Sequence, residues 1–225
     1  INGAINQKYN DYYGKRKLCN KALKKSVFFP LQMVPEYTSL NLGWAHDQLN
    51  LILEISLNLP IDYKLIVKEH YFAMNARSIS FYKFIKKLPN VELIHPSING
   101  KYLAENSCMV IAISSTALYE AALYGKPVIT FEDSNYIRDL PHVFKIDSAK
   151  EIEKIKEIIK KFDSAFEQKI AKENSLKMQK LIANNLFSIK GNLGYLNLHN
   201  FSSSLSSLTK IDEVESKILM NKLKK

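Results

Sequence analysis

Residues 107–131 constrain the fold of this chain more than any other stretch. They read SCMVIAISSTALYEAALYGKPVITF. The apolar run 109–113 is too short for an isolated helix and too continuous for a half-exposed strand, so it predicts a parallel strand covered on both faces. A short helix ends at Gly125, and a second buried strand is predicted at 128–131. This strand–helix–strand order is the repeating unit of a parallel sheet.

Three hydroxyl residues, Ser114, Ser115 and Thr116, fall where the first of these strands gives way to the helix. Free backbone N–H groups and the positive end of the helix meet there, which suits a bound anion. A Ser-Ser-Thr sequence before a helix is also an ordinary N-cap, and taken alone that is the simpler interpretation. Glu120 lies one helical turn beyond Thr116 and is predicted to face the same strand end, although a capping or ion-pairing Glu fits that position equally well.

The alternation of strands and helices extends on both sides of this unit. Further strands are predicted at 26–32, 63–70, 91–94 and 142–146, and helices at 44–59, 76–88, 100–107, 149–162 and 164–187. Asp147 and Ser148 are expected to cap the helix that begins at residue 149. The pattern predicts an α/β fold, a Rossmann-like doubly wound parallel sheet with a helical C-terminal tail.

Composition divides the chain into three regions. Residues 1–25 are predicted to be a basic N-terminal segment or interdomain linker, and residues 26–187 the Rossmann-like domain. Residues 188–225 are predicted to hold a Ser- and Asn-rich connector and a terminal helix. Because the chain begins at Ile1, without an initiator Met, we expect it to be a piece of a longer protein.

The net charge of +10 is concentrated at the two ends of the chain. Residues 1–25 carry seven Lys or Arg residues against one Asp, and residues 217–225 add four lysines, which leaves the body close to neutral. Basic ends on a neutral domain favour solvated tails or contact with an anionic membrane over a base-reading groove. Nucleic acid is therefore not an expected partner, although a tail that tracks phosphates stays an alternative.

The sequence predicts a cytoplasmic protein, with peripheral contact to the inner membrane as a further expectation. No window approaches the ~18 consecutive apolar residues of a membrane span, and the N-terminus lacks the apolar core of a signal peptide. The only cysteines, Cys19 and Cys108, provide neither a disulfide framework nor a metal site.

Polar residues follow three of the predicted strands. The first strand leads to Gln32, Pro35, Glu36, Tyr37 and Thr38, the second ends in Lys68, Glu69 and His70, and the third leads to Ser114, Ser115 and Thr116. Each group also has an ordinary interpretation, such as a turn or a surface cluster. Ligands of open parallel sheets bind outside the carboxyl ends of the strands, so the convergence of three polar ends on one rim favours a binding site.

These motifs, in this order, resemble the capsule polysaccharide biosynthesis family of bacterial glycosyltransferases. The resemblance covers about residues 26–140 and is carried by FFPLQMVPEYTS, LIVKEH, LPNVELIHP and ISSTALYEAALYGKPVITF. That family is similar to capsular Kdo transferases and, more distantly, to bacterial sialyltransferases with two facing Rossmann domains, the GT-B architecture. The resemblance implies that this chain is one half of a GT-B enzyme, the C-terminal donor-binding part, without the acceptor-binding half.

The resemblance also implies roles for residues at the first two strand ends. The Gln-x-x-Pro-Glu motif of the family falls on Gln32, Pro35 and Glu36, which would line the cleft between the domains, with Glu36 as a catalytic residue. The Lys-Glu-His-Pro motif falls on Lys68, Glu69 and His70, with Tyr71 in place of the proline. In the related enzymes such a His contacts the nucleotide phosphate and assists its departure, so His70 is the second catalytic residue implied.

The third strand end matches the Ser/Gly-Thr-x-x-x-Glu turn of the family. Ser115, Thr116 and Glu120, with Ser114 alongside, would hold the phosphate and the ribose or cytosine of a nucleotide-sugar donor. A CMP-linked sugar such as Kdo is the first expectation for the donor, and a glycan or glycolipid is expected as the acceptor. No further cofactor is implied.

No metal is expected, because the chain lacks an Asp-x-Asp pair after a strand. Two alternative functions stay open. The first is an enzyme similar to UDP-sugar 2-epimerases, which share the sheet and the phosphate turn. The second is a non-catalytic Rossmann scaffold of a polysaccharide assembly complex, which the replacement of the motif proline by Tyr71 keeps open.

Overall fold

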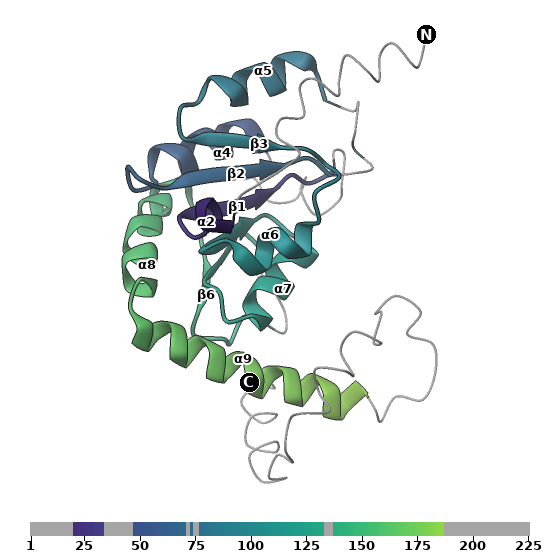
Figure 1. The fold of residues 1–225 in the computed structure, drawn as a ribbon, viewed down its shortest axis with the longest axis vertical. Helices are drawn as coiled ribbons and strands as arrows, with labels where there is room; N and C mark the ends of the chain where they lie inside the picture. The colour runs from purple at the N-terminus through teal and green to yellow at the C-terminus, as the bar shows by residue number, and fades with distance from the viewer. Residues whose placement is uncertain (1–19, 34–46, 71–72, 74–76, 133–136, 187–225) are drawn as a thin grey trace.

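The computed structural model describes residues 20–33, 47–70, 73, 77–132 and 137–186. Their centre is a single sheet (Figure 1), which consists of six strands. The strands are β1 (Ser26–Pro30), β2 (Lys64–Lys68), β3 (Val91–Ile94), β4 (Met109–Ala112), β5 (Val128–Thr130) and β6 (Val143–Lys145). Every neighbouring pair is parallel, and the order across the sheet is β3-β2-β1-β4-β5-β6. This is the strand order of the Rossmann fold, so the predicted fold class is confirmed.

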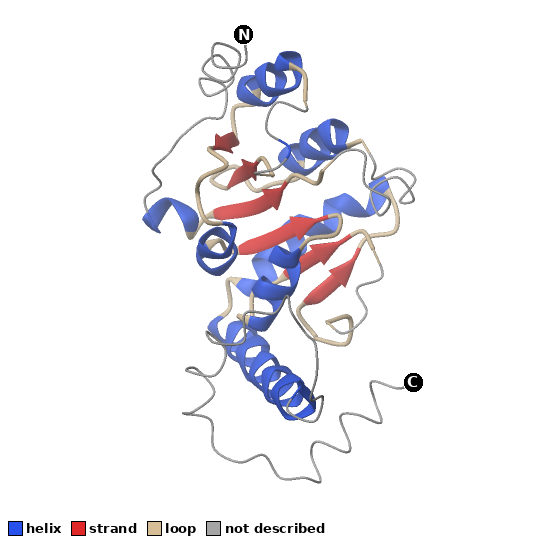
Figure 2. Cartoon of the chain, turned by 90° about the vertical axis from the view of Figure 1, so that its right-hand side faces the viewer, coloured by secondary structure: helices blue, strands red, loops and turns tan. Residues whose placement is uncertain are grey.

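Helices cover both faces of the sheet (Figure 2). They are α2 (Asn20–Leu23), α4 (Gln48–Leu57), α5 (Ile79–Lys87), α6 (Gly100–Asn106), α7 (Thr116–Leu123), α8 (Lys154–Phe162) and α9 (Ala165–Leu186), with a 3-10 helix, η3 (Ala149–Glu153), before α8. None of the helices in the described ranges combines the length and the apolar character that crossing a membrane requires.

Two hydrophobic clusters form because successive strand residues point to opposite faces. On one face, Phe29 packs in a cluster with residues of α4, α5 and α8, such as Ile52, Tyr82 and Ile155. On the other face, its neighbour Phe28 packs in a cluster with residues of α6, α7 and α9. Burial on both faces explains why the strands read as continuous apolar runs rather than alternating ones.

Within the described residues, the elements predicted from sequence are present, and three details differ. The predicted helix 149–162 consists of η3 followed by α8. Ser148 stands at the N-cap of η3 without a side-chain capping bond, and the Glu151 carboxylate instead accepts a hydrogen bond from the Asp147 N–H at 2.8 Å. The segment before β1 contains the unpredicted α2, whose Leu23 is fully buried. The predicted terminal helix lies outside the described residues.

Candidate functional site

A pocket of about 550 Å³ lies at the carboxyl ends of β1, β2 and β4. It is lined by Gln32, Lys68, Glu69, His70, Ser114, Ser115, Thr116 and Glu120, together with Phe28, Pro30, Leu31, Met33, Asn99, Gly100, Lys101, Ala117 and Tyr119. The strand order reverses between β1 and β4, and this switch point is where open parallel sheets bind ligands. The pocket therefore gathers every described residue of the predicted site, while Pro35 and Glu36 lie outside the described residues.

Ser115 is the N-cap of α7, and its side-chain oxygen accepts a hydrogen bond from the Ala117 N–H at 3.2 Å. The simpler interpretation of the Ser-Ser-Thr sequence is thus correct for Ser115. The capping bond uses a lone pair of the oxygen, so the hydroxyl proton can still be donated into the pocket. Thr116, the first residue of α7, is exposed at the same place. Capping and anion binding are therefore compatible at this helix end.

Two charged side chains of the pocket are partly buried, with opposite effects on their pKa values. Burial lowers the pKa of Lys68, and the nearby Glu69 carboxylate opposes that shift. Burial raises the pKa of Glu120, and the positive charge of Lys101 opposes that shift. Because burial disfavours the charged form in both cases, each group would gain from a partner of opposite charge. For Lys68 that partner would be an anion.

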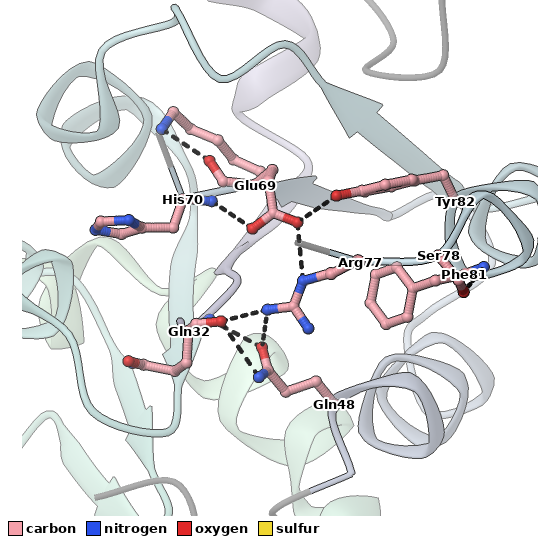
Figure 3. A network of polar contacts seen from close by, with 9 residues as sticks. Gln32, Gln48, Glu69, His70, Arg77, Ser78, Phe81 and Tyr82 are labelled. Carbon is pink, nitrogen blue, oxygen red and sulfur yellow. Dashed lines mark hydrogen bonds and ion pairs between the residues drawn. The ribbon is translucent and has the colours of Figure 1, made fainter. Parts of the chain in front are cut away.

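The Glu69 carboxylate is fully buried and accepts hydrogen bonds from three groups of the described residues (Figure 3). One oxygen accepts from the backbone N–H of His70 at 2.7 Å. The other accepts from the Arg77 Nε at 2.8 Å and from the Tyr82 hydroxyl at 2.7 Å. These three hydrogen bonds direct the carboxylate into the protein, while Glu69 also lines the pocket, and its expected contact with the nucleotide-sugar donor stays a prediction. His70 follows it at the pocket.

Arg77 joins the end of β2 to the end of β1. Its terminal nitrogen Nη2 donates to the Gln32 carbonyl and to the Gln48 Oε1 at 3.4 Å. Gln48, in the first turn of α4, accepts at Oε1 from the Gln32 N–H at 2.8 Å. The guanidinium also lies over the Phe81 ring, 4.9 Å from its centroid. A chain of buried polar contacts therefore connects two of the three strand ends.

Sequence reasoning did not find Arg77, Gln48 or Tyr82. Arg77 precedes a helix that carries several surface lysines, and nothing in its sequence position separates it from them. Tyr82 occupies the apolar face of α5 and reads as a core residue. The only available signal was indirect. A buried carboxylate such as that of Glu69 requires a hydrogen-bond donor, which implies a partner elsewhere in the chain.

The N-terminus of α6 also reaches the pocket through Asn99, Gly100 and Lys101. Asn99 caps α6, since its Oδ1 accepts from the Lys101 N–H at 2.9 Å. The helix was predicted at this position, but its place in the site was not. In the part of the chain that the structure describes, no three His, Cys, Asp or Glu residues form a group that could hold a metal ion. A metal-independent reaction remains a prediction.

Solved structures resemble this fold at low sequence identity. The chain is similar to the glycotransferase of kitacinnamycin, with 11% identity, a TM-score of 0.48 and coverage of 78% of this chain and 45% of that one. It is similar to the UDP-GlcNAc 2-epimerase from Neisseria meningitidis bound to UDP-GlcNAc, with 15% identity, a TM-score of 0.46 and coverage of 83% and 48%. For Anabaena Alr3699/HepE in complex with UDP-glucose, the identity is 15%, the TM-score 0.48 and the coverage 80% and 55%. The chain spans about half the length of these proteins.

Comparison with protein families gives a more direct result. No curated protein matches the sequence significantly. A family model described as capsule polysaccharide biosynthesis protein matches residues 2–139, which is more than half of the chain. The match includes all four motifs on which the resemblance was based. The chain therefore belongs to the capsule polysaccharide biosynthesis protein family.

Proposed function

We propose that this chain forms the donor-binding half of a glycosyltransferase that acts in capsule or surface polysaccharide biosynthesis. The observation that carries the proposal is the convergence of Lys68, His70 and the N-terminus of α7 on one pocket at the switch point of the sheet. A nucleotide-activated sugar is the expected ligand, and a CMP-linked sugar such as Kdo is the first candidate. The acceptor, a glycan or glycolipid, would be bound with the help of a second domain.

The pocket suits the chemistry of glycosyl transfer. The bond between the anomeric carbon and the donor phosphate oxygen breaks, the oxygen of an acceptor hydroxyl forms the new bond, and the proton of that hydroxyl passes to a base. Negative charge therefore builds up on the phosphate oxygen that leaves. Backbone N–H groups at the start of α7, the Ser115 hydroxyl and the Lys68 ammonium are suited to stabilise that charge, and His70 is suited to assist departure.

The half-buried Lys68 supports this assignment. Its ammonium is partly removed from water, and within the described residues it donates one hydrogen bond, to the Glu69 backbone carbonyl at 3.3 Å. A phosphate in the pocket would provide a charge-assisted hydrogen bond in place of the lost water. The phosphate would then compensate for the solvation that burial takes from the ammonium.

The test is a calorimetric titration of the chain with CMP, CDP, UMP and UDP. A preference for CMP supports the proposal, a preference for UDP favours an epimerase-like enzyme, and no binding at millimolar concentrations favours a scaffold. His70→Ala and Ser115→Ala are each expected to weaken binding while the melting temperature stays within a few degrees. Ser175→Ala is the matched control, because that hydroxyl donates to the Ala122 carbonyl near the far end of α7. Unchanged affinity in both pocket variants would refute the site.

The location and the membrane contact are separate parts of the proposal. We expect the protein to act in the cytoplasm, with its basic ends against the anionic surface of the inner membrane. Sedimentation with anionic and with neutral vesicles tests this, since binding to the anionic vesicles alone is expected. Equal recovery with both kinds of vesicle would contradict it.

A further inference from the structure

We infer that Arg77 is a positioning residue of the donor site, which fixes the pocket ends of β1 and β2 relative to each other. The consequence of this role for donor binding rests on the proposed function. The role itself rests on the polar contacts shown in Figure 3. No motif includes Arg77, and its guanidinium does not belong to the lining of the pocket.

The guanidinium is suited to this role by its shape. Its Nε–H donates to Glu69 on the β2 side, while Nη2 donates to the Gln32 carbonyl on the β1 side. The side chain is only 10% exposed, and the Phe81 ring covers one face of the guanidinium. A planar group with several fixed donors can hold two acceptors at a set angle, which a lysine ammonium cannot do in the same way.

The effect of Arg77 reaches His70 through Glu69. The Glu69 oxygen that is not in the ion pair accepts a hydrogen bond from the His70 backbone N–H. The Tyr82 hydroxyl donates to the other oxygen. The peptide that carries His70 is therefore fixed by a carboxylate whose own orientation depends on Arg77. On the β1 side, the Gln32 N–H is fixed by Gln48, which Arg77 also contacts.

A structural role alone does not explain why this network is ionic. Removing two charges from water is costly, and a well-packed apolar group of similar volume often gives equal or greater stability. What the ion pair adds is a defined orientation of its partners. Because that orientation is imposed on the segments that carry Gln32 and His70, we place its function in the donor site.

The experiment measures amide hydrogen exchange by NMR on the ligand-free chain and nucleotide affinity by calorimetry. Arg77→Met is expected to raise exchange at the His70 and Gln32 amides by about tenfold or more relative to the Ile111 amide in β4. Arg77→Lys is expected to restore the protection of these amides against exchange only in part.

Tyr82→Phe retains the buried ring, removes one hydrogen-bond donor to Glu69 and is expected to raise exchange at the His70 amide alone. Ile159→Val, a truncation of a buried α8 side chain, serves as the control for general loss of stability.

The outcomes separate the inference from the proposed function. Faster exchange confined to His70 and Gln32, with nucleotide affinity about tenfold lower in Arg77→Lys and unchanged in Ile159→Val, supports the inference. Unchanged exchange at His70 and Gln32 in Arg77→Met overturns it, as does an equal rise at Ile111. If the unmodified chain binds no nucleotide, the proposed function fails, and the exchange rates alone decide whether Arg77 holds the two strand ends.

Discussion

Gly125 packs directly against the backbone of Lys172 in α9. A Cβ atom on Gly125 would lie 2.9 Å from both the Cα and the N of Lys172, and the φ of Gly125 is +72°. Both conditions exclude a side chain, because left-handed backbone is strained for other residues and the neighbouring backbone cannot move aside cheaply. The turn that follows α7 is therefore also the surface on which α9 docks.

Gly125→Ala is accordingly expected to lower the free energy of unfolding by about 3 kcal/mol, from backbone strain and the clash with α9. Denaturation in urea, followed by circular dichroism, measures the change. Gly100→Ala is the matched control, since a Cβ there meets nothing within 4 Å. An equal loss in the two variants would contradict the close contact with α9.

Ser175 continues this contact between α7 and α9. Its hydroxyl lies 2.7 Å from the Ala122 carbonyl and 2.8 Å from the Ala171 carbonyl, in a fully buried environment. Ala122 is one of the last residues of α7, where carbonyl groups lack partners within the helix. Ser175→Ala is expected to cost about 1 kcal/mol of unfolding free energy in the same urea assay. A variant as stable as the parent chain would show that the bond contributes nothing.

His142 gives a prediction about pH. Its ring is buried and lies 2.8 Å from the Ala122 carbonyl, and burial lowers its pKa below the ordinary value of 6.5 although that hydrogen bond opposes the shift. As the pH falls below about 6.5, the unfolded chain takes up a proton that the folded chain binds less readily. The contribution of the neutral His142 ring to the free energy of unfolding is therefore complete above that pH and is lost as the pH decreases.

The measurement is the free energy of unfolding between pH 5 and pH 8 for the parent chain and for His142→Gln. The variant lacks the titrating ring, so its stability should fall less steeply toward pH 5 than that of the parent chain. Parallel pH curves would show that His142 does not titrate differently in the folded state.

The sequence was sufficient to predict the sheet and the strand ends that form the pocket, for a physical reason. Strands buried on both faces are continuous apolar runs, and parallel strands place their carboxyl ends on one edge, so Lys68 and Ser115 had to lie near each other. The position of Arg77 was not predictable in this way. Gln32 lies 45 residues before it and Glu69 eight residues before it, and neither separation fits a helical or strand spacing that sequence reasoning can use. The pairing depends on how α5 packs against the sheet.

Lys68 provides the last prediction, because its burial favours nucleotide binding at the expense of the stability of the folded chain. Burial holds the pKa of its ammonium below the ordinary value of 10.5, so at neutral pH the charged form is less stable in the folded chain than in water. Lys68→Met removes that cost and is expected to raise the unfolding free energy by about 1 kcal/mol. It also removes the cation from the pocket, so nucleotide affinity should fall by about tenfold. Lys177→Met, at an exposed position on α9, is the control in which neither quantity should change. A Lys68 variant that is less stable than the parent chain and binds nucleotide equally well would place Lys68 among the structural residues instead.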